Sequence, residues 1–439
     1  MRQMKESGIQ WLGKVPEHWE ISRLKSRIAK RFGGCWGEEP TPENMGNARL
    51  CVRIADFDFN TQTVKSSAAT MRAYTYSQIY KTKLLDGDII VEKSGGGEKT
   101  PVGRTIIFNS QQFDGSEVLF ANFCECFRLK KVKSKFFAYL LKTFYQSNDM
   151  HLYFNQTTGL QNLDIEAVIN SKAAFPSLDE QERIAAFLDK ECSKIDSIYA
   201  DVEKQIETLE QYKRSVITEA VTKGLNPNVV MKDSGISYVG EIPQHWEQHP
   251  VYYYFAEGKK SNAACKEENL LSLSFGKVIR KDINTNGGLL PASFSTYNIV
   301  NKDDIIIRPT DLQNDKRSLR TGLVKERGII TSAYIDLVPY KDVNSHYYHY
   351  LLHSYDIMKV FYNMGNGVRQ GLNYSEFSKL IIITPSKDEQ QEIVAYLDKK
   401  CAEIESVIAD KKKQLEVLEN FKKSLIYEHV TGKKEVVNE

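Results

Sequence analysis

The chain uses one plan twice, and this internal repeat limits the possible folds more than any other feature. Residues 7–20, SGIQWLGKVPEHWE, return as SGISYVGEIPQHWE in residues 234–247, an offset of 227. A second signature, PSLDEQ from Pro176, returns as PSKDEQ from Pro385, an offset of 209. Because the offset falls from 227 to 209, the first globular segment is 18 residues longer than the second. The repeat therefore has shared borders and different interiors.

A heptad pattern follows each PSxDEQ signature. Apolar or bulky residues in the first copy are Leu188, Cys192, Ile195, Tyr199, Val202, Ile206, Leu209 and Val216, with Lys213 interrupting. In the second copy they are Leu397, Cys401, Ile404, Ile408, Leu415, Leu418 and Leu425, with Lys411 and Lys422 interrupting. A stripe that repeats every 3.5 residues requires a partner helix, and each run is the obvious partner of the other. Two unrelated surface helices on separate domains are the alternative.

The ends of these helices are also marked in the sequence. Ser177 and Ser386 can cap the first turns, where the following acidic residues suit the helix dipole. Gly224 and Gly432 are expected to end the two runs. Some 40 residues at about 1.5 Å each would make a rod of roughly 60 Å.

The segments between the landmarks predict a mixed α/β fold. Strand-like runs occupy residues 50–54, 88–91, 104–108, 304–307 and 328–331. Each copy also has an aromatic-rich helical stretch, 136–141 or 347–352, and then a Gly/polar loop, 158–163 or 367–372. We therefore expect two globular α/β domains, 1–176 and 233–385, and two spacer helices, 177–232 and 386–439, antiparallel and related by a pseudo-twofold repeat.

Composition excludes several classes of protein. Of the 439 residues 41% are hydrophobic and 26% charged, as in ordinary folded proteins. No stretch approaches about 18 apolar residues and no signal peptide is recognisable, which predicts a cytoplasmic protein without a membrane span. The seven cysteines form no CxxC pair, so a disulfide framework or zinc ribbon is not expected. The net charge is +2, but residues 1–176 carry 24 basic and 18 acidic side chains.

Candidate catalytic motifs fail on inspection. The segment Lys93–Thr100, KSGGGEKT, departs from a phosphate-binding P-loop because Glu98 precedes Lys99 and no helix should follow. His346, His349 and His353 share a helical face, but their counterparts in the first copy cannot bind a metal, so a polar helix face is the better interpretation. No GxSxG or HExxH motif and no amino-methyltransferase tetrapeptide is present. Neither a catalytic nor a metal site is expected.

The loops that differ most between the copies are basic and rich in hydrogen-bonding groups. Arg and Lys can bridge guanine O6 and N7, Asn and Gln can bridge adenine N6 and N7, and Asp can accept from cytosine. The candidates in the first copy are Lys93, Ser94, Lys99, Arg104, Gln161 and Asn162. Those in the second copy are Arg308, Thr310, Asp311, Gln313, Asn314, Lys316, Arg317, Arg320, Arg369 and Gln370. Their parallel placement favours direct reading of double-stranded DNA.

The combination of motifs resembles the specificity subunit of a type I restriction–modification system. The resemblance covers nearly the whole chain: the two GxxWxG/GxxYxG openings with PxHW, the strands GDII (87–90) and DDII (303–306), and the two PxxxEQxxIxxLD helix starts. It implies two target-recognition domains that each read half of a bipartite DNA site, held apart by antiparallel helices. It also implies no catalytic residue and no cofactor bound by this chain. Two modification subunits would bring S-adenosylmethionine, and restriction subunits would add ATP- and Mg-dependent translocation and cleavage.

Two other classes of function remain open at this point. A single-chain methyltransferase or nuclease would need catalytic motifs that the sequence does not display. A purely structural coiled-coil protein would leave the basic loops without a role.

Overall fold

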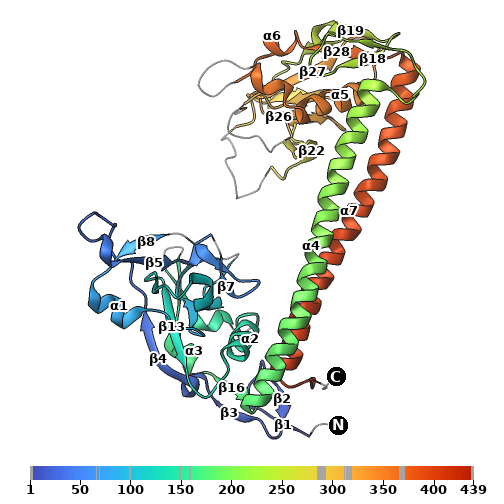
Figure 1. Ribbon diagram of the computed structural model, residues 1–439. Helices are drawn as coiled ribbons and strands as arrows, with labels where there is room; N and C mark the ends of the chain where they lie inside the picture. The colour runs from blue at the N-terminus through green and yellow to red at the C-terminus, as the bar shows by residue number, and fades with distance from the viewer. Residues whose placement is uncertain are drawn as a thin grey trace. The chain divides into compact units, whose positions relative to one another are not determined.

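A computed structural model describes residues 3–65, 67–68, 70–97, 100–147, 150–157, 160–283, 293–310, 312, 319–364 and 371–436 (Figure 1). The chain forms two compact units. Unit 1 is Met1–Asp201 with Gln414–Glu439, and unit 2 is Val202–Lys413. Each unit holds one α/β module and parts of both long helices, α4 (Leu178–Lys223) and α7 (Lys387–Val430). The units thus divide the chain differently from the four predicted segments.

Module 1, residues 3–175 of unit 1, is built around an antiparallel sheet of order β11-β9-β13-β4. Helix α2 (Ser134–Tyr145) packs on this sheet through a face of buried aromatic and aliphatic residues. A sheet β12-β5-β8, a sheet β10-β15-β14 and the pair β16-β3 complete the module with the hairpins β1-β2 and β6-β7. The remaining helices are α1 (Tyr76–Thr82) and α3 (Ile165–Asn170). The strands are β1 Met4–Glu6, β2 Lys14–Pro16, β3 Glu20–Arg23, β4 Ile28–Gly33, β5 Ala48–Val52, β6 Phe57–Asp58, β7 Thr63–Val64, β8 Met71–Ala73, β9 Ile89–Glu92, β10 Ser94–Gly96, β11 Thr105–Ile107, β12 Val118–Phe120, β13 Cys124–Leu129, β14 Phe154–Thr157, β15 Leu160–Leu163 and β16 Lys172–Phe175.

Module 2, residues 231–384 of unit 2, repeats this frame. Its central sheet has the order β25-β24-β27-β20, and helix α5 (Ser345–Ile357) takes the place of α2. The pair β28-β19 and the hairpin β17-β18 again flank the sheet, whereas β21-β22 and β23-β26 are its own additions, with α6 (Tyr374–Phe377) near the end. The strands are β17 Met231–Asp233, β18 Glu241–Pro243, β19 Glu247–Pro250, β20 Phe255–Glu257, β21 Leu271–Ser274, β22 Lys277–Arg280, β23 Asn298–Val300, β24 Ile305–Ile307, β25 Thr321–Leu323, β26 Gly328–Ile330, β27 Ile335–Pro339 and β28 Ile381–Thr384. The predicted mixed α/β class and the repeat are confirmed.

One predicted loop is wrong. Residues 160–163 form strand β15, which pairs with both β10 and β14 and alternates exposed and buried residues. The Gly at 159 suggested a loop, but Gln161 and Leu163 face the interior while Leu160 and Asn162 face outward, which is the period-2 pattern of a strand. The matching loop of the second copy, 367–370, lies outside the described residues.

Both long helices begin and end where the sequence predicts. The hydroxyls of Ser177 and Ser386 accept hydrogen bonds from the amides of Glu180 and Glu389, each at 3.3 Å. After the last turns, Gly224 and Gly432 have φ of +76° and +74°, a backbone conformation that glycine adopts without strain. In the described part of the chain, no helix is long and apolar enough to cross a membrane.

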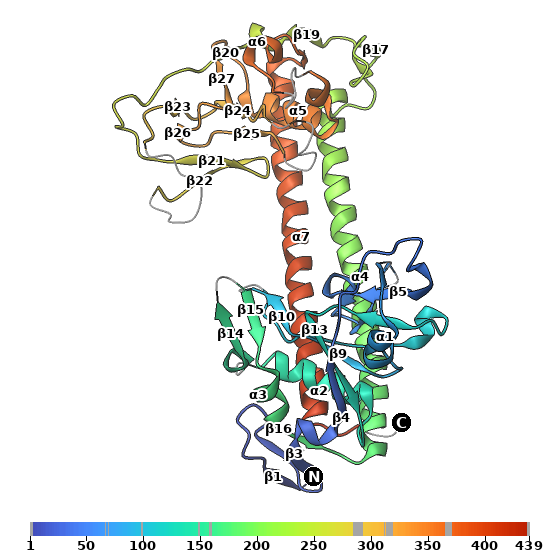
Figure 2. The same cartoon turned by 90° about the vertical axis from the view of Figure 1, so that its left-hand side faces the viewer.

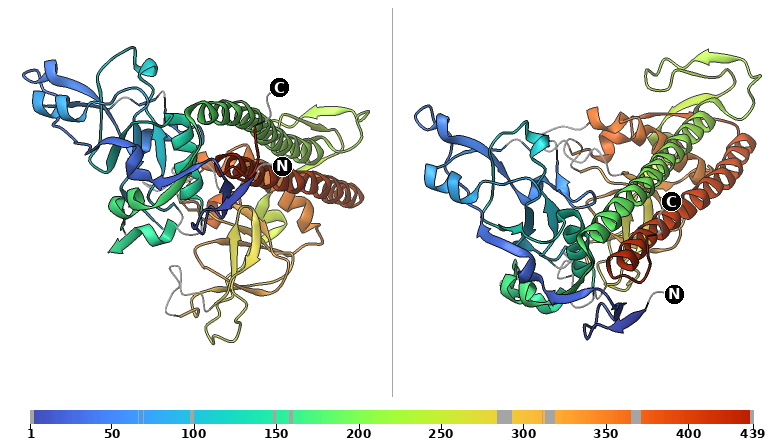
Figure 3. Two further views of the ribbon diagram at one scale, coloured as in Figure 1. Left: turned by 90° about the horizontal axis from the view of Figure 1, so that it is seen from below. Right: turned by 60° about the horizontal axis from the view of Figure 1, so that its bottom comes forward.

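The two helices run antiparallel alongside each other within each unit (Figures 1 and 3). In unit 1, Lys422 of α7 donates to both carboxylate oxygens of Asp196 of α4, at 2.6 and 2.7 Å. In unit 2, Lys213 of α4 forms an ion pair with Glu405 of α7. Adding the repeat offset of 209 to Asp196 gives Glu405, and subtracting it from Lys422 gives Lys213. Two of the lysines that interrupt the heptads, Lys213 and Lys422, thus make the same ion pair in the two copies, and both pairs link α4 to α7.

Each module is fastened to the start of a long helix by a carboxylate, which is buried in Glu180 and partly buried in Glu389. Glu180 accepts from the indole of Trp19 at 3.2 Å and bonds with His18 at 3.0 Å. Glu389 makes the same two contacts, with Trp246 at 3.3 Å and His245 at 2.8 Å. The repeated PxHW and PSxDEQ signatures are therefore the two halves of one joint.

The opening hairpin of each module also covers the end of a long helix. In unit 1, Lys433, just beyond α7, donates to the carbonyl of Leu12 at 2.7 Å, and Tyr427 donates to the carbonyl of Trp11 at 3.2 Å. In unit 2, the end of α4 packs its buried residues Ala220 and Val221 in one core with residues of the β17-β18 hairpin and Trp246. In unit 2 the helix and the hairpin that pack together are consecutive in the chain. In unit 1 they are the last helix and the first hairpin of the chain.

The modules differ inside their sheets. In module 1, Arg128 donates two hydrogen bonds, at 3.0 and 2.7 Å, to the buried carboxylate of Asp88. Asp304 is the equivalent residue in module 2, since GDII and DDII align. Strand β13 pairs Cys126 with Ile90, and β27 pairs Asp336 with Ile306, so Val338 takes the place of Arg128. The second module therefore lacks the arginine that neutralises this carboxylate.

Asp336 is the unusual group that results. It is 2% exposed, and among the described residues neither of its carboxylate oxygens has a hydrogen-bond partner. Burial, with a smaller contribution from the nearby Asp304, raises the pKa of Asp336 to about 8. Burial also raises the pKa of Asp304 to about 6. Module 2 thus holds a carboxylic acid that is protonated at neutral pH when the protein is folded.

This predicts a stability that falls as the pH rises. The folded-state pKa of Asp336 lies above its ordinary 3.8, so its protonated form favours the folded state below about pH 4, and that contribution is lost as the pH rises to about 8. Asp336→Asn cannot ionise, and we expect it to stabilise unit 2 by about 1–3 kcal/mol more at pH 8 than at pH 5. Thermal unfolding between pH 5 and 9 measures this difference. The exposed Asp410→Asn is the control; equal gains at both pH values would contradict the prediction.

Candidate nucleic-acid interface

In module 1 the structure brings together two of the predicted DNA-binding segments. Strand β10 pairs with β15 so that Ser94 lies opposite Asn162, and the Ser94 hydroxyl donates to Oδ1 of Asn162 at 2.6 Å. The amide of Leu163 donates to the carbonyl of Lys93 at 2.8 Å. Figure 2 shows β10, β15 and β14 as one small sheet. Residues almost 70 positions apart in the sequence therefore present their polar groups on one strand pair.

The side chains on this strand pair differ in exposure. Asn162 is exposed, and so is Lys93, whose ammonium lies 3.7 Å from the carboxylate of Glu125. Gln161 is buried, and its Oε1 accepts from the amide of Val102 at 3.3 Å. Lys93 and Asn162 can therefore reach a ligand, whereas Gln161 holds the neighbouring loop in place.

Arg104 has a structural role in module 1. Its guanidinium donates Nε and Nη2 to the carboxylate of Glu92, both at 2.8 Å, and lies 3.9 Å from the centre of the Phe59 ring. The hydrogen bond to Glu92 is the main cause of the raised pKa of Arg104. Glu92 is buried, so the pair neutralises a charge within the module rather than leaving a cation for DNA.

Module 2 repeats the joint between these segments. The amide of Leu372 donates to the carbonyl of Pro309 at 3.0 Å, as Leu163 does to Lys93 in module 1. The predicted residues Arg308 and Thr310 flank Pro309; Arg308 is partly buried and Thr310 exposed. This backbone hydrogen bond is thus made in both modules, while the side chains beside it differ.

The structure gives Arg320 a different place from the one expected of a base-reading residue. It is fully buried, its Nη1 donates to the carbonyl of Thr310 at 2.5 Å, and its amide donates to Asp356 at 2.5 Å. Arg320 occupies the position of Arg104, and Arg308 that of Glu92, because both pairs follow GDII and DDII at the same distance. With a second arginine in place of the carboxylate, Arg320 bonds to main-chain carbonyls and holds the ends of the polar loop together.

Six of the predicted DNA-binding residues lie outside the described residues: Lys99, Asp311, Lys316, Arg317, Arg369 and Gln370. Their DNA contacts stay a prediction. Gln313 and Asn314 lie outside as well.

The segments examined for catalysis form no such site in the described structure. The residues from Ser94 to Gly96 belong to a β-strand, whereas a P-loop needs a turn before a helix. Within the described ranges, no group of three His, Cys, Asp or Glu side chains could hold a metal ion. Burial lowers the pKa of His349 to about 3 and that of His353 to about 4, so both imidazoles are neutral. They line a cavity beside the long helices together with polar residues such as Lys213 and Glu405.

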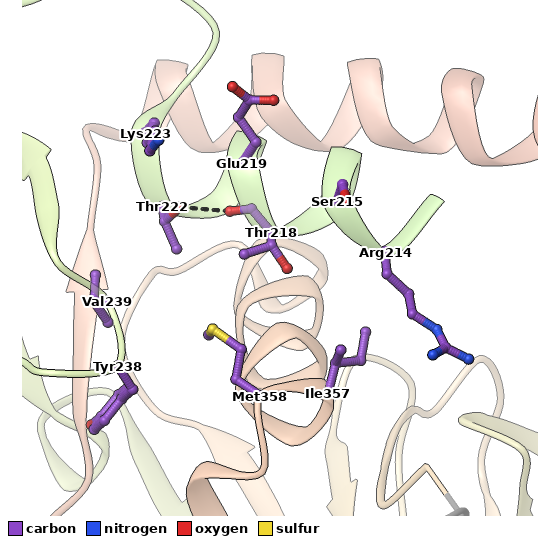
Figure 4. Close-up of a pocket in the computed structure, with 10 residues that line it drawn as sticks. All are labelled: Arg214, Ser215, Thr218, Glu219, Thr222, Lys223, Tyr238, Val239, Ile357 and Met358. Atoms are coloured by element: carbon purple, nitrogen blue, oxygen red, sulfur yellow. Dashed lines mark hydrogen bonds between the residues drawn. The ribbon is translucent and has the colours of Figure 1, made fainter. Parts of the chain in front are cut away.

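A pocket of about 420 Å³ lies between the end of α4 and the end of α5 in unit 2 (Figure 4). The hydroxyl of Thr218 bonds to that of Ser354 at 2.9 Å, and Thr222 donates to the carbonyl of Thr218 at 2.6 Å. The lining is Arg214, Ser215, Thr218, Glu219, Thr222, Lys223, Tyr238, Val239, Ile357 and Met358. The lining includes no histidine or cysteine, and these hydrogen bonds of Thr218 and Thr222 join them to a hydroxyl and a main-chain carbonyl rather than to a base.

Sequence reasoning missed one residue of this interface. The carbonyl of Phe123 accepts from the amides of Lys93 and Ser94, at 2.9 and 3.2 Å, and so sets the position of β10. Phe123 is 55% exposed. The sequence feature that could have identified Phe123 is its place in a short turn between two buried strands, where an aromatic residue is unusual.

We predict that the polar residues separate into two classes. Arg104→Ala and Arg320→Ala should destabilise their modules by about 2–4 kcal/mol, because buried partners are left unpaired, without changing base preference in the folded protein. Lys93→Ala and Asn162→Ala should change DNA binding and leave the melting temperature nearly unaltered. Thermal unfolding and selection from a randomised DNA library measure the two properties. Altered base preference in a folded Arg320→Ala variant would contradict this division.

Comparison with known proteins gives a consistent result. The family whose profile matches residues 59–208 and 254–417 is described as type I restriction modification DNA specificity domain. Two relatives from Methanocaldococcus jannaschii are named as type I restriction enzyme specificity subunits. The MjaX protein is 25% identical over 438 residues, covering 96% of this chain and 95% of its own. The MjaVIII protein is 25% identical over 298 residues, covering 64% and 66%. A solved structure from work on assembly and conformational transition of the type I R-M system has a TM-score of 0.67 at 14% identity, covering 96% of this chain and 99% of that one.

Proposed function

The chain belongs to the type I restriction–modification DNA specificity family, and we propose that each of its modules reads one half of a bipartite DNA site. The observation that supports this proposal is a backbone hydrogen bond that occurs in both modules, from Leu163 to Lys93 and from Leu372 to Pro309. It joins the two predicted polar segments at an equivalent point in both modules, while the side chains beside it differ. Such a design suits two different half-sites read with one geometry.

Exchanging one module tests this proposal. We expect replacement of residues 21–175 by the same region of a relative to change only the first half-site, because the borders that fasten the module are shared. Mapping methylated adenines across a genome by long-read sequencing reads both half-sites at once. The matched control is the exchange of the second module alone. A change of both half-sites by either exchange would show that the modules do not read independently.

The antiparallel helices would set the distance between the half-sites. Val202 and Lys411 are equivalent positions, 209 residues apart, that lie between the two interhelix ion pairs in sequence. Inserting a heptad after both positions lengthens each helix by about 10 Å and preserves the heptad register. Inserting it after one position alone lengthens only one helix, so the two interhelix ion pairs cannot both form.

We expect the double insertion to add about three base pairs to the spacer, at roughly 3.4 Å per base pair, without altering either half-site. The single insertion should lose assembly or activity. Methylation mapping measures the spacer. An active double-insertion complex with an unchanged spacer would exclude the helices as the ruler.

Two modification subunits would bind at equivalent places on the helices. Unit 1 exposes Ile198 of α4 and Phe421 of α7, and unit 2 exposes Val407 and Tyr212, which are the same two positions after the offset of 209. Exposed apolar side chains that recur in both copies indicate two similar docking surfaces. Restriction subunits would join this assembly and cleave DNA.

Charge at one docking surface should remove one modification subunit. We expect Phe421→Asp or Tyr212→Asp to give a complex with one modification subunit, and the double variant to give none, since burial of a carboxylate opposes docking. Native mass spectrometry counts the subunits. Tyr252→Asp, at an exposed tyrosine of module 2 away from the helices, is the control. Loss of both subunits in either single variant would argue against two separate surfaces.

In this proposal the chain recognises DNA and catalyses no step. S-adenosylmethionine would be bound by the modification subunits, and ATP and Mg by the restriction subunits, in the cytoplasm where these partners meet DNA. The support is the residue set: the described polar groups are engaged in positioning or face outward as donors and acceptors. Methyl transfer from labelled S-adenosylmethionine by the isolated chain would contradict this assignment.

A further inference from the structure

A pocket of about 440 Å³ in module 1 is lined by Trp36, Arg53, Ile54, Ala55, Ala121, Asn122 and Phe123. Two of its walls are aromatic rings with a large exposed fraction, 39% for Trp36 and 55% for Phe123. Aromatic side chains that stay open to solvent on a folded domain are candidates for ligand contact. The size and the flat apolar walls suit a planar ring.

The polar parts of the pocket are held in place before any ligand arrives. Arg53 donates Nε and Nη2 to the carboxylate of Asp56, both at 3.0 Å. The guanidinium of Arg72 lies 4.7 Å from the centre of the Trp36 ring and donates to the carbonyl of Trp36 at 3.2 Å. The amide of Asn122 is exposed at the rim and offers a donor and an acceptor. Arg72 thus supports Trp36 from outside the lining, and the lining itself offers one arginine, an amide and aromatic faces to a heteroaromatic ring with polar edges.

The pocket is continuous with the edge that we assign to DNA reading. The carbonyl of Phe123 accepts from the amides of Lys93 and Ser94. Module 2 lacks the wall that Phe123 forms, because Cys126 and Asp336 are equivalent and three residues earlier Phe123 is replaced by Ala333. An aromatic wall in one reader only is expected of a residue that contributes to that reader's specificity.

From this juxtaposition we propose that the pocket binds one nucleobase of the first half-site, turned out of the helical stack, with its ring against Trp36 and Phe123. The inference rests on the proposed reading of the first half-site by module 1. An apolar side chain of a protein partner would not use Arg53 and the rim amide. A base has both a face for the aromatic walls and an edge for the polar groups.

The test uses the full complex with modification subunits and DNA duplexes altered at one position at a time through the first half-site. Omitting the base that enters the pocket should weaken binding about tenfold, the usual contribution of one base stacked on an aromatic residue. Omitting its partner on the other strand should strengthen binding, because an unpaired base leaves the stack more readily. In Phe123→Ala both effects should disappear at that position and persist elsewhere.

Tyr80→Ala is the matched control, since Tyr80 is an exposed aromatic residue of the same module outside the pocket. A Phe123→Ala complex that retains the wild-type response at every position overturns the inference. A wild-type complex also overturns it if there is no position at which omission of the partner base strengthens binding. Loss of a modification subunit from Phe123→Ala, with unchanged responses in the remaining complex, would assign the pocket to a protein partner instead. If the unaltered complex selects no bipartite site at all, it is the proposed function that fails.

Discussion

The architecture depends on a carboxylate in the first turn of each long helix. Glu180 and Glu389 each accept from a tryptophan indole and bond with a histidine of the module's opening motif. Burial opposes ionisation of Glu389, but hydrogen bonds from His245, Ser386 and Trp246 outweigh it and hold its pKa below the ordinary value. Each bond would be weak at the surface; in a partly buried joint it ties the opening hairpin of a module to the end of that module's chain.

This fastening explains why the interiors of the modules can diverge. The residues of the joint belong to the borders that both modules share. In the sheets between these borders, buried charged groups are paired differently in the two modules. Module 1 neutralises Asp88 with Arg128 and Glu92 with Arg104. Module 2 has Val338 in place of Arg128, and burial raises the pKa of Asp304 to about 6. It has Arg308 in place of Glu92, and Arg320 donates to main-chain carbonyls instead. Both modules nevertheless keep the backbone hydrogen bond from Leu163 to Lys93 or from Leu372 to Pro309.

Much of the fold was accessible from the sequence because it is repeated or periodic. The helix limits at Ser177 and Gly224, and the strands from GDII and DDII, follow from capping, glycine and hydrophobic patterns that act over a few residues. The roles of Arg104 and Arg320 were not accessible, because they depend on which residue lies across the sheet. Trp36 and Phe123 come together through folding over nearly 90 residues, and neither belongs to a motif. Local rules therefore predicted the frame, while long-range neighbours decided which polar residues face outward.

The opening hairpin of module 1 packs on the end of α7 just as that of module 2 packs on the end of α4, although only the second contact is bridged by a peptide link. The packing is therefore the same whether or not the hairpin and the helix are joined by the chain. A rearranged gene that joins the residues after α7 to the first hairpin, and opens the chain after Gly224, would encode the same packing in a different order. Duplication of a half-length gene whose products paired head to tail is a simple origin for such a molecule, and permuted relatives would be equally compatible with its core.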